Sequence, residues 1–390
     1  MHQTFHRDRF TWLAYLSLAY YAYFLNVLGP ITPFLKDELR LSYTVSSFHF
    51  TAFAVGILLI GFAGHLPIQR MGRWTSLWIG MFGISLSAVL LVAGRHPVIT
   101  IGASFLMGLI GSLILAIVPA ALADQHGEMR AVALSEGNMI SSLVASCAAL
   151  MVGWSASLAG NWRWALGILA VAPLFMYLIF GKGSSSTTIS ISKETGSSTP
   201  SLPVLFWIYW MALVLAVSVE FCMIFWSADY LENVLGMVKA NAAQAVSLFL
   251  GAMIVGRMAG SRFVQHFSTR SVVMLSILIA SLGFLIFWRT ENIFAGLIGL
   301  FLTGLGVANL YPLILSMTIG AANGNTVQAS ARTTLASGTA ILALPLALGR
   351  LADAVGIRSA YSVVLVLLIG VFLISQIARK ISLAPRSATQ

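Results

Sequence analysis

The sequence predicts an all-α polytopic membrane protein with twelve transmembrane helices, arranged as two pseudo-symmetric six-helix bundles. Three observations predict this: an extreme apolar composition, apolar stretches long enough to cross a bilayer, and glycines that recur half a chain apart. Hydrophobic residues make up 58% of the 390 residues and charged residues 9%, whereas soluble domains average about 25% charged residues. The composition therefore excludes a water-soluble globule.

The apolar stretches have the length that a spanning helix needs, about 20 residues. The first follows the polar N-terminus MHQTFHRDRF without a signal-peptide cleavage site, so we expect it to remain as the first span. The twelve expected spans are 11–33, 44–66, 74–94, 98–123, 131–157, 162–180, 204–227, 241–263, 271–289, 293–319, 328–349 and 359–379.

One polar segment divides the chain near its midpoint. Residues 184–201 read SSSTTISISKETGSSTPS, a composition that cannot bury enough apolar area to offset the entropy of ordering. We therefore predict an N-terminal six-helix bundle at 1–180, a flexible linker at 181–203 and a C-terminal six-helix bundle at 204–390.

The two halves share glycines at a nearly constant offset of 195 or 196 residues. The matched sets are Gly56 and Gly61 with Gly251 and Gly256, Gly108 with Gly304, and Gly153 and Gly160 with Gly349 and Gly356. Glycines let membrane helices approach closely, so matched glycines predict matched packing in the two bundles. This favours parallel repeats, with a substrate path between them.

The basic residues indicate the orientation. On the side of the expected spans that carries both termini and the linker we count 14 Lys and Arg, and 8 on the other side, of 22 in all. The positive-inside rule then places both termini and the linker in the cytoplasm, and the protein in the cell (inner) membrane. The basic residues are scattered, so the net charge of +10 does not indicate nucleic-acid binding.

Three segments together resemble the major facilitator superfamily of transporters, and the likeness covers essentially the whole chain. They are GHLPIQRMGR at 64–73, NWRWA at 161–165 and GRLADAVG at 349–356. The resemblance implies two six-helix bundles that alternate access to a central cavity. Gln69 departs from the family pattern, which usually has an acidic residue there. We expect Asp124 to substitute by pairing with Arg70 or Arg73 at a cytoplasmic gate.

The resemblance implies a cavity lined mainly by the first, fourth, seventh and tenth spans. These spans offer aromatic and amide side chains that suit a partly apolar organic solute. The candidate substrate-binding residues are Tyr20, Tyr23, Asn26, Phe225, Trp226, Asn309 and Tyr311. For Tyr23 and Asn26 the cavity is favoured over an interfacial belt, whereas Asn309, close to Pro312, suits a cavity role and a helix-packing role equally.

Ionisable residues inside spans are functional candidates because burying them is costly. Glu220 lies about two-thirds along the span 204–227, which contains no Lys or Arg, so we predict a role in proton coupling or in binding a substrate cation. Glu136 is the second proton-coupling candidate. It also matches Arg332 at the repeat offset, so the two either form a gating ion pair or simply face headgroups and the cytoplasmic vestibule.

The expected function is secondary active transport of a small organic solute, coupled to protons, by a monomer embedded in a lipid bilayer. A multidrug exporter and a lipid flippase are the alternatives, and a channel or a transporter-like receptor is the least favoured. The drug-antiporter interpretation is weakened because 101–120 contains no Arg and the next span no Gly-Pro pair. No phosphate loop or His-Glu-x-x-His motif occurs, so we expect no enzyme activity, cofactor or metal. Cys147 and Cys222 are expected to be buried free thiols.

Overall fold

The computed structural model describes residues 6–181, 202–322 and 326–383, and the part of the chain that it describes is helical and contains no strand. This confirms the predicted all-α class. The helices of the first half are α1 Arg9–Leu39, α2 Tyr43–Ala63, α3 His65–Met71, α4 Arg73–Ala93, α5 Pro97–His126, η1 Gly127–Met129, α6 Arg130–Leu158, α7 Trp164–Ala170 and α8 Ala172–Phe180. Those of the second half are α9 Val204–Asn233, α10 Lys239–His266, α11 Thr269–Arg289, α12 Ile293–Val307, α13 Leu310–Gly320, α14 Thr326–Val355, α15 Ile357–Ala360 and α16 Ser362–Leu383.

Ten helical segments of the described residues are long and apolar enough to cross a membrane. They cover ten of the twelve expected spans. The other two are α1, whose tyrosines and Asn26 lower its hydropathy although it is 31 residues long, and the shorter apolar segment Trp164–Phe180. Helix therefore occupies every predicted span, and the ends of α1 and α9 lie six residues beyond the predicted ones.

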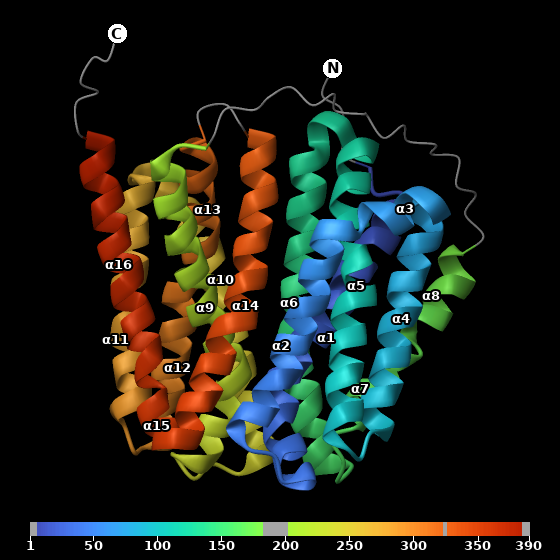
Figure 1. Ribbon diagram of the computed structural model, residues 1–390, viewed down its shortest axis with the longest axis horizontal. Helices are drawn as coiled ribbons and strands as arrows, with labels where there is room; N and C mark the ends of the chain where they lie inside the picture. The colour runs from blue at the N-terminus through green and yellow to red at the C-terminus, as the bar shows by residue number, and fades with distance from the viewer. Residues whose placement is uncertain (1–5, 182–201, 323–325, 384–390) are drawn as a thin grey trace. The chain divides into compact units, whose positions relative to one another are not determined.

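The chain separates into two compact units. Unit 1 comprises 1–193 with 224–251, and unit 2 comprises 194–223 with 252–390. The helical hairpin formed by the end of α9 and the start of α10 therefore belongs to the unit of the N-terminal helices. In Figure 1 the long helices within each unit run side by side. The predicted linker 181–203 lies almost wholly outside the described residues.

Two expected spans are interrupted, each near a proline. The sixth breaks at Val171, just before Pro173, and the tenth breaks at Asn309, just before Pro312. Proline lacks the N–H that would donate to the carbonyl four residues earlier, so a break at these places is expected.

Only part of the glycine repeat has a packing reason. A side chain at Gly108 of α5 would collide with the α2 backbone at Phe53, and one at Gly256 of α10 with the α12 backbone at Leu305. By contrast, Gly61 and Gly251 have open space where a Cβ would lie. The predicted matching of close approaches is therefore wrong for these two.

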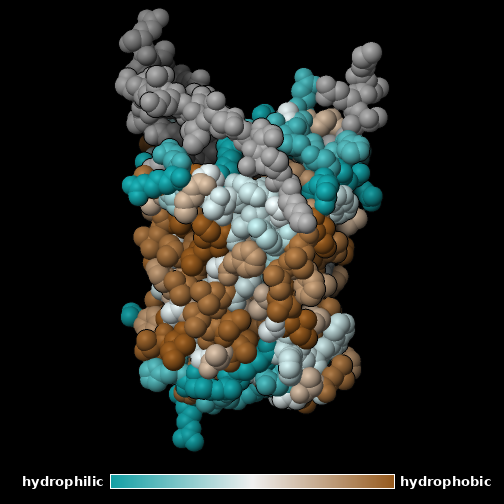
Figure 2. Space-filling model, turned by 90° about the vertical axis from the view of Figure 1, so that its right-hand side faces the viewer, coloured by the Kyte–Doolittle hydropathy of each residue, from teal (hydrophilic) through white to brown (hydrophobic). Residues whose placement is uncertain are grey.

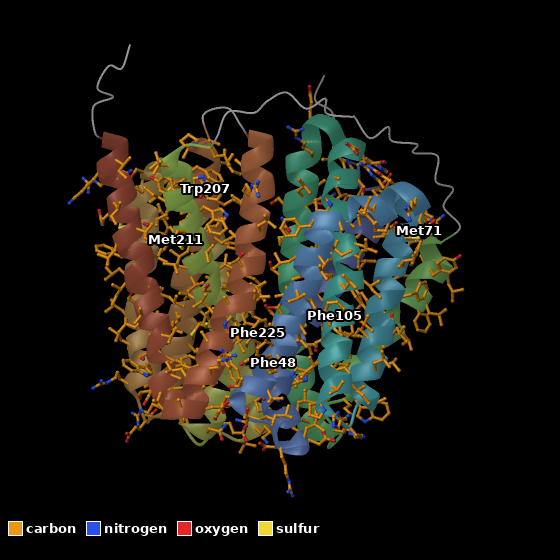
Figure 3. All side chains as sticks on the ribbon, in the orientation of Figure 1. Phe48, Met71, Phe105, Trp207, Met211 and Phe225 are labelled. Carbon is orange, nitrogen blue, oxygen red and sulfur yellow. The ribbon has the colours of Figure 1, made fainter. Side chains whose placement is uncertain are left out.

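The surface has the polarity of a membrane protein. Figure 2 shows a hydrophobic belt between two hydrophilic ends on the face it presents. In unit 2, Trp207 and Met211 lie one turn apart on α9 and are exposed (Figure 3). Both cysteines are free, but only Cys222 is buried. The prediction of a buried thiol is therefore wrong for Cys147, which is exposed on α6.

Candidate functional site

In unit 2 a carboxylate and a guanidinium meet between two long helices. Glu220 lies in the middle third of α9, and its Oε1 is 3.8 Å from Nη2 of Arg257 on α10. The Glu220 side chain is 16% exposed and that of Arg257 is 40% exposed. The separation is longer than a hydrogen bond, so this is a loose ion pair. Glu220 has no basic residue in its own span, and its partner Arg257 on α10 was not predicted from the sequence.

The break in the tenth span places two predicted residues beside this pair. Tyr311, half-buried at the start of α13, interacts electrostatically with both Glu220 and Arg257. Asn309 is buried and its Nδ2 donates to the carbonyl of Gly256, at 2.9 Å. This hydrogen bond joins the break between α12 and α13 to α10, next to Arg257.

In unit 1 the predicted residues of α1 are buried and hydrogen-bonded. The hydroxyl of Tyr23 donates to the carbonyl of Ala165 in α7, at 2.8 Å. That of Tyr20 lies 2.9 Å from the hydroxyl of Ser85 in α4. Asn26 donates to the carbonyl of Ala22 in its own helix. The polar atoms of these three side chains therefore have contacts inside unit 1.

Phe225 and Trp226, at the start of the hairpin in unit 1, are fully buried. The Phe225 ring stacks on Phe50 of α2 with centroids 4.0 Å apart and planes 4° from parallel. Trp226 approaches Phe50 edge-on at 5.6 Å and Tyr43 at 5.7 Å. Figure 3 shows Phe225 beside the ribbon of α2. These rings hold the hairpin against α2.

Glu136, at the start of α6, is bound by the segment that precedes α1. Arg7 donates to both of its oxygens, at 2.6 and 2.8 Å, and Tyr15 donates to Oε2 at 3.2 Å. The hydrogen bond and the negative charge of Glu136 raise the pKa of the Arg7 guanidinium above its ordinary value. Arg7 was not a candidate from the sequence, because it precedes the first span.

The remaining gating candidates lie at helix ends. Arg73 at the start of α4 donates to Asp124 near the end of α5, at 2.7 Å. Arg70, at the end of α3, is exposed. Arg332 of α14 is also exposed, and its carbonyl accepts from Trp210. Arg332 belongs to unit 2 and Glu136 to unit 1, so the pairing predicted for them stays a prediction.

Unit 1 contains a charge cluster that the sequence analysis missed. Lys36 of α1 forms an ion pair with Asp229 of the hairpin, and Lys239 forms ion pairs with Asp37 and Glu232. Asp229 is fully buried. Both members of the first pair fell just outside the expected spans, which ended at residues 33 and 227. The signal that could have revealed them is the helix-forming sequence that continues past both limits, FLKDEL at 34–39 and ADYLEN at 228–233.

A family model supports the resemblance noted from the sequence. The model described as Major Facilitator Superfamily matches residues 13–267. An uncharacterized MFS-type transporter of Yersinia pestis is 31% identical over 157 residues, which are 39% of this chain and 40% of that protein. Membrane protein MosC of Rhizobium meliloti is 33% identical over 138 residues, which are 35% of this chain and 33% of that protein. The chain thus spans less than half the length of these curated relatives.

Solved structures of similar fold cover nearly the whole chain. A bacterial homologue of the human lysosomal transporter Spinster, in an inward-facing and occupied conformation, matches 97% of this chain and 98% of its own with a TM-score of 0.76 and 15% identity. The nucleoside transporter NupG matches 96% of this chain and 98% of its own, with a TM-score of 0.71 and 12% identity. At these identities the likeness concerns the fold.

Proposed function

The chain belongs to the Major Facilitator Superfamily and is a multi-pass membrane transporter of a small molecule, and on that premise we propose that it drives a small organic solute by alternating access, coupled to protons at Glu220. The observation that carries the coupling is the loose Glu220–Arg257 pair. A carboxylate inside a membrane helix is costly, and such residues mark substrate and ion pathways. At 3.8 Å from its partner, Glu220 can exchange Arg257 for a proton without breaking a short hydrogen bond.

The surroundings of the pair support a solute that is partly apolar. Tyr311 offers an aromatic face with a hydroxyl, and Asn309 fixes the neighbouring backbone. Rings of this kind bind organic solutes by stacking and edge hydrogen bonds. Tyr20, Tyr23, Asn26, Phe225 and Trp226 are proposed to reach the solute only in conformations in which their contacts inside unit 1 are released.

The test uses substrates identified first by thermal shift, because a specific ligand stabilises the folded protein by mass action. The panel contains sugars, organic acids, nucleosides, drugs and lysolipids, so that it also covers the exporter and flippase alternatives. We expect Glu220→Gln to abolish accumulation driven by a pH gradient, and to leave gradient-free exchange within about twofold of the parent. The matched control is Glu291→Gln, the same change at a side chain that is 82% exposed.

A double variant separates coupling from a purely structural role. If Glu220 serves only to neutralise Arg257, then Glu220→Gln combined with Arg257→Gln regains driven accumulation, because no charge is left unbalanced. We expect no recovery. Recovery in the double variant, or driven accumulation by Glu220→Gln with an unchanged pH profile, contradicts the proposed proton site.

We also propose that both termini and the linker are cytoplasmic and that Glu136 and Arg332 help to close the cytoplasmic side, together with Arg70, Arg73 and Asp124. Single cysteines in the linker and at Lys239 should differ in labelling by an impermeant reagent on intact cells, with labelling at Lys239 alone. Reversing both Glu136 and Arg332 should regain transport lost in each single reversal. If the double reversal transports no better than the worse of the two single reversals, the proposed pairing is wrong.

A further inference from the structure

The exposed face of α6 in unit 1 has a polar edge and an apolar edge. Asn138, Ser142 and Ser146 follow one another at intervals of four residues, and their side chains are exposed or half-buried. Met139 and Leu143, which lie beside them on the same face, are 55% and 49% exposed. Apolar side chains suit lipid, whereas lipid tails offer hydroxyl and amide groups no hydrogen-bond partner. The polar edge of α6 is therefore expected to face water or a polar ligand.

The polar edge leads to the place where the hairpin docks on α6. Gly153 lies seven residues after Ser146, a spacing that returns to the same side of a helix. A side chain at Gly153 would collide with the carbonyl of Ala240 and with the side chain of Gln244, both on α10. The start of α10 thus packs directly against α6 beyond the end of the polar edge.

Past this contact the two helices leave open space. Ser247 and Gly251 lie three and seven residues after Gln244, on the same side of α10. A Cβ at Gly251 would have no atom within 4 Å. The fifth and eighth spans cross the membrane in opposite directions, so Ser146 lies at about the level of Ser247 and Gly251, about 10 Å from the contact at Gly153. The polar sides of α6 and α10 therefore border the same space within unit 1.

Uncharged hydrogen-bonding groups line this space. The hydroxyl of Ser146 donates to the carbonyl of Ser142, at 3.0 Å, and its oxygen can still accept. Gln244 is half-buried, and its amide makes no hydrogen bond within the part of the chain that the structure describes. Because an amide both donates and accepts, Gln244 and Ser146 together offer donors and acceptors to one ligand.

We propose that the space between α6 and α10 is a subsite for hydroxyl groups of the transported solute, with Ser146, Gln244 and Ser247 as specificity-determining residues. A hydroxyl group both donates and accepts, so it suits an amide and a serine oxygen at once. A charged group would find no counterion among these three side chains. The solute is thus assigned to the uncharged polyhydroxylated compounds. The subsite rests on the proposed transport of a small organic solute, but not on the coupling role of Glu220.

The first measurement distinguishes water from lipid in the space. Single reporters Ser146→Cys and Ser247→Cys are introduced into a cysteine-free variant, and the full chain in lipid nanodiscs is labelled with a negatively charged thiol reagent. The matched controls are the neighbours Leu143→Cys and Leu248→Cys, at positions that are 49% and 39% exposed. Since a thiol ionises only where water reaches it, we expect both serine positions to react at least about tenfold faster than their controls. Equal rates overturn the proposal.

The second measurement tests the class of solute. The reporter is Gly251→Cys, which lies in the open space and leaves the three proposed side chains intact. It is labelled in the presence of myo-inositol, D-ribose or D-glucose, with cyclohexanol as the control that has a ring but a single hydroxyl group. We expect a polyhydroxylated probe to slow labelling in a saturable manner and cyclohexanol to have no effect. If no polyhydroxylated probe slows labelling, or if cyclohexanol slows it equally, the assigned class is wrong.

Substitutions then test the assigned residues. Gln244→Met retains the length of the side chain without its hydrogen-bonding groups, and Ser146→Ala removes the hydroxyl. Each should weaken protection of the Gly251→Cys reporter by at least about threefold, as expected for one hydrogen bond. The control Gln376→Met makes the same change on α16 of unit 2 and should leave protection within about twofold. Unchanged protection in both subsite variants overturns the assignment. No step measures transport or uses a pH gradient, so this failure is distinguishable from failure of the coupling proposed for Glu220.

Discussion

The ion pair of unit 1 and the ion pair of unit 2 join the same kinds of charge in different surroundings. Asp229 has no exposed side-chain surface and pairs with Lys36, whose ammonium lies 4.0 Å over the centre of the Tyr43 ring. Glu220 keeps 16% of its side-chain surface, and its partner Arg257 keeps 40% across a gap of 3.8 Å. The first pair is more enclosed than the second, because Lys36 is 12% exposed whereas Arg257 is 40% exposed.

This difference distinguishes an ion pair that maintains a contact from an ion pair whose members can change partners. A desolvated pair in contact makes each charge indispensable to the other, so it suits a contact that must stay made in one state. A loose and partly exposed pair loses little when one member takes another partner. The following changes test whether burial alone explains this contrast.

The largest effect is expected at Lys36. The change Lys36→Ala leaves the buried Asp229 carboxylate without its partner, and should lower the free energy of unfolding by about 3–5 kcal/mol. Thermal unfolding of the purified protein in detergent measures the loss. Adding Asp229→Ala removes the stranded charge and should recover a large part of it; a double variant no more stable than Lys36→Ala contradicts this account.

The next effect is steric and compares two glycines of unit 1. The change Gly29→Ala forces a methyl group into the α9 backbone, at an expected cost of about 1–3 kcal/mol. The control Gly251→Ala fills open space in α10, and should be neutral or stabilise by up to about 1 kcal/mol, as alanine favours helix. Equal effects in thermal unfolding would show that close approach does not decide the outcome.

One hydrogen bond between uncharged groups in each unit provides a reference against which the two ion pairs can be compared. Tyr23 donates to the carbonyl of Ala165 in unit 1, and Tyr361 donates to that of Cys222 in unit 2, at 2.8 and 3.1 Å. Both tyrosines are fully buried. Each Tyr→Phe change should cost about 1 kcal/mol in unfolding free energy. A much larger loss in one unit would indicate that the units differ in stability and not only in their ion pairs.

The smallest effect on stability is expected at the open pair. The change Arg257→Gln should alter the unfolding free energy by less than about 1 kcal/mol, because its side chain is 40% exposed and its contact with Glu220 is long. Transport should nevertheless fall if the pair serves coupling. A loss of stability as large as that of Lys36→Ala would place both pairs in the same structural class and remove the contrast.

The sequence predicted the spans well because hydropathy acts locally. Every expected span became helix, although the sixth and the tenth are interrupted near prolines. The ends were less certain: α1 and α9 continue six residues past the expected limits. Lys36 and Asp229 lie in those extensions, so charged residues that are part of long helices were assigned to loops.

The partners of the charged residues could not be predicted from the sequence. Lys36 and Asp229 are 193 residues apart, and no local pattern selects this pair from the other charges. Glu220 was identified from its own span, but its partner comes from α10. Tyr23 shows a related limit. An aromatic residue deep in a span suits both a cavity and a buried hydrogen bond, and the structure shows its hydrogen bond to α7.

The unbroken course of α9 has a mechanical consequence. Its 30 residues contain no proline, and both Glu220 and Asp229 project from it, nine positions apart. At 1.5 Å and about 100° per residue, the two carboxylates are separated by about 14 Å along the axis and face opposite directions. The helix is thus a stiff rod with a charge on each side. Because one continuous helix carries both carboxylates, rotation of α9 about its own axis moves Asp229 and Glu220 together.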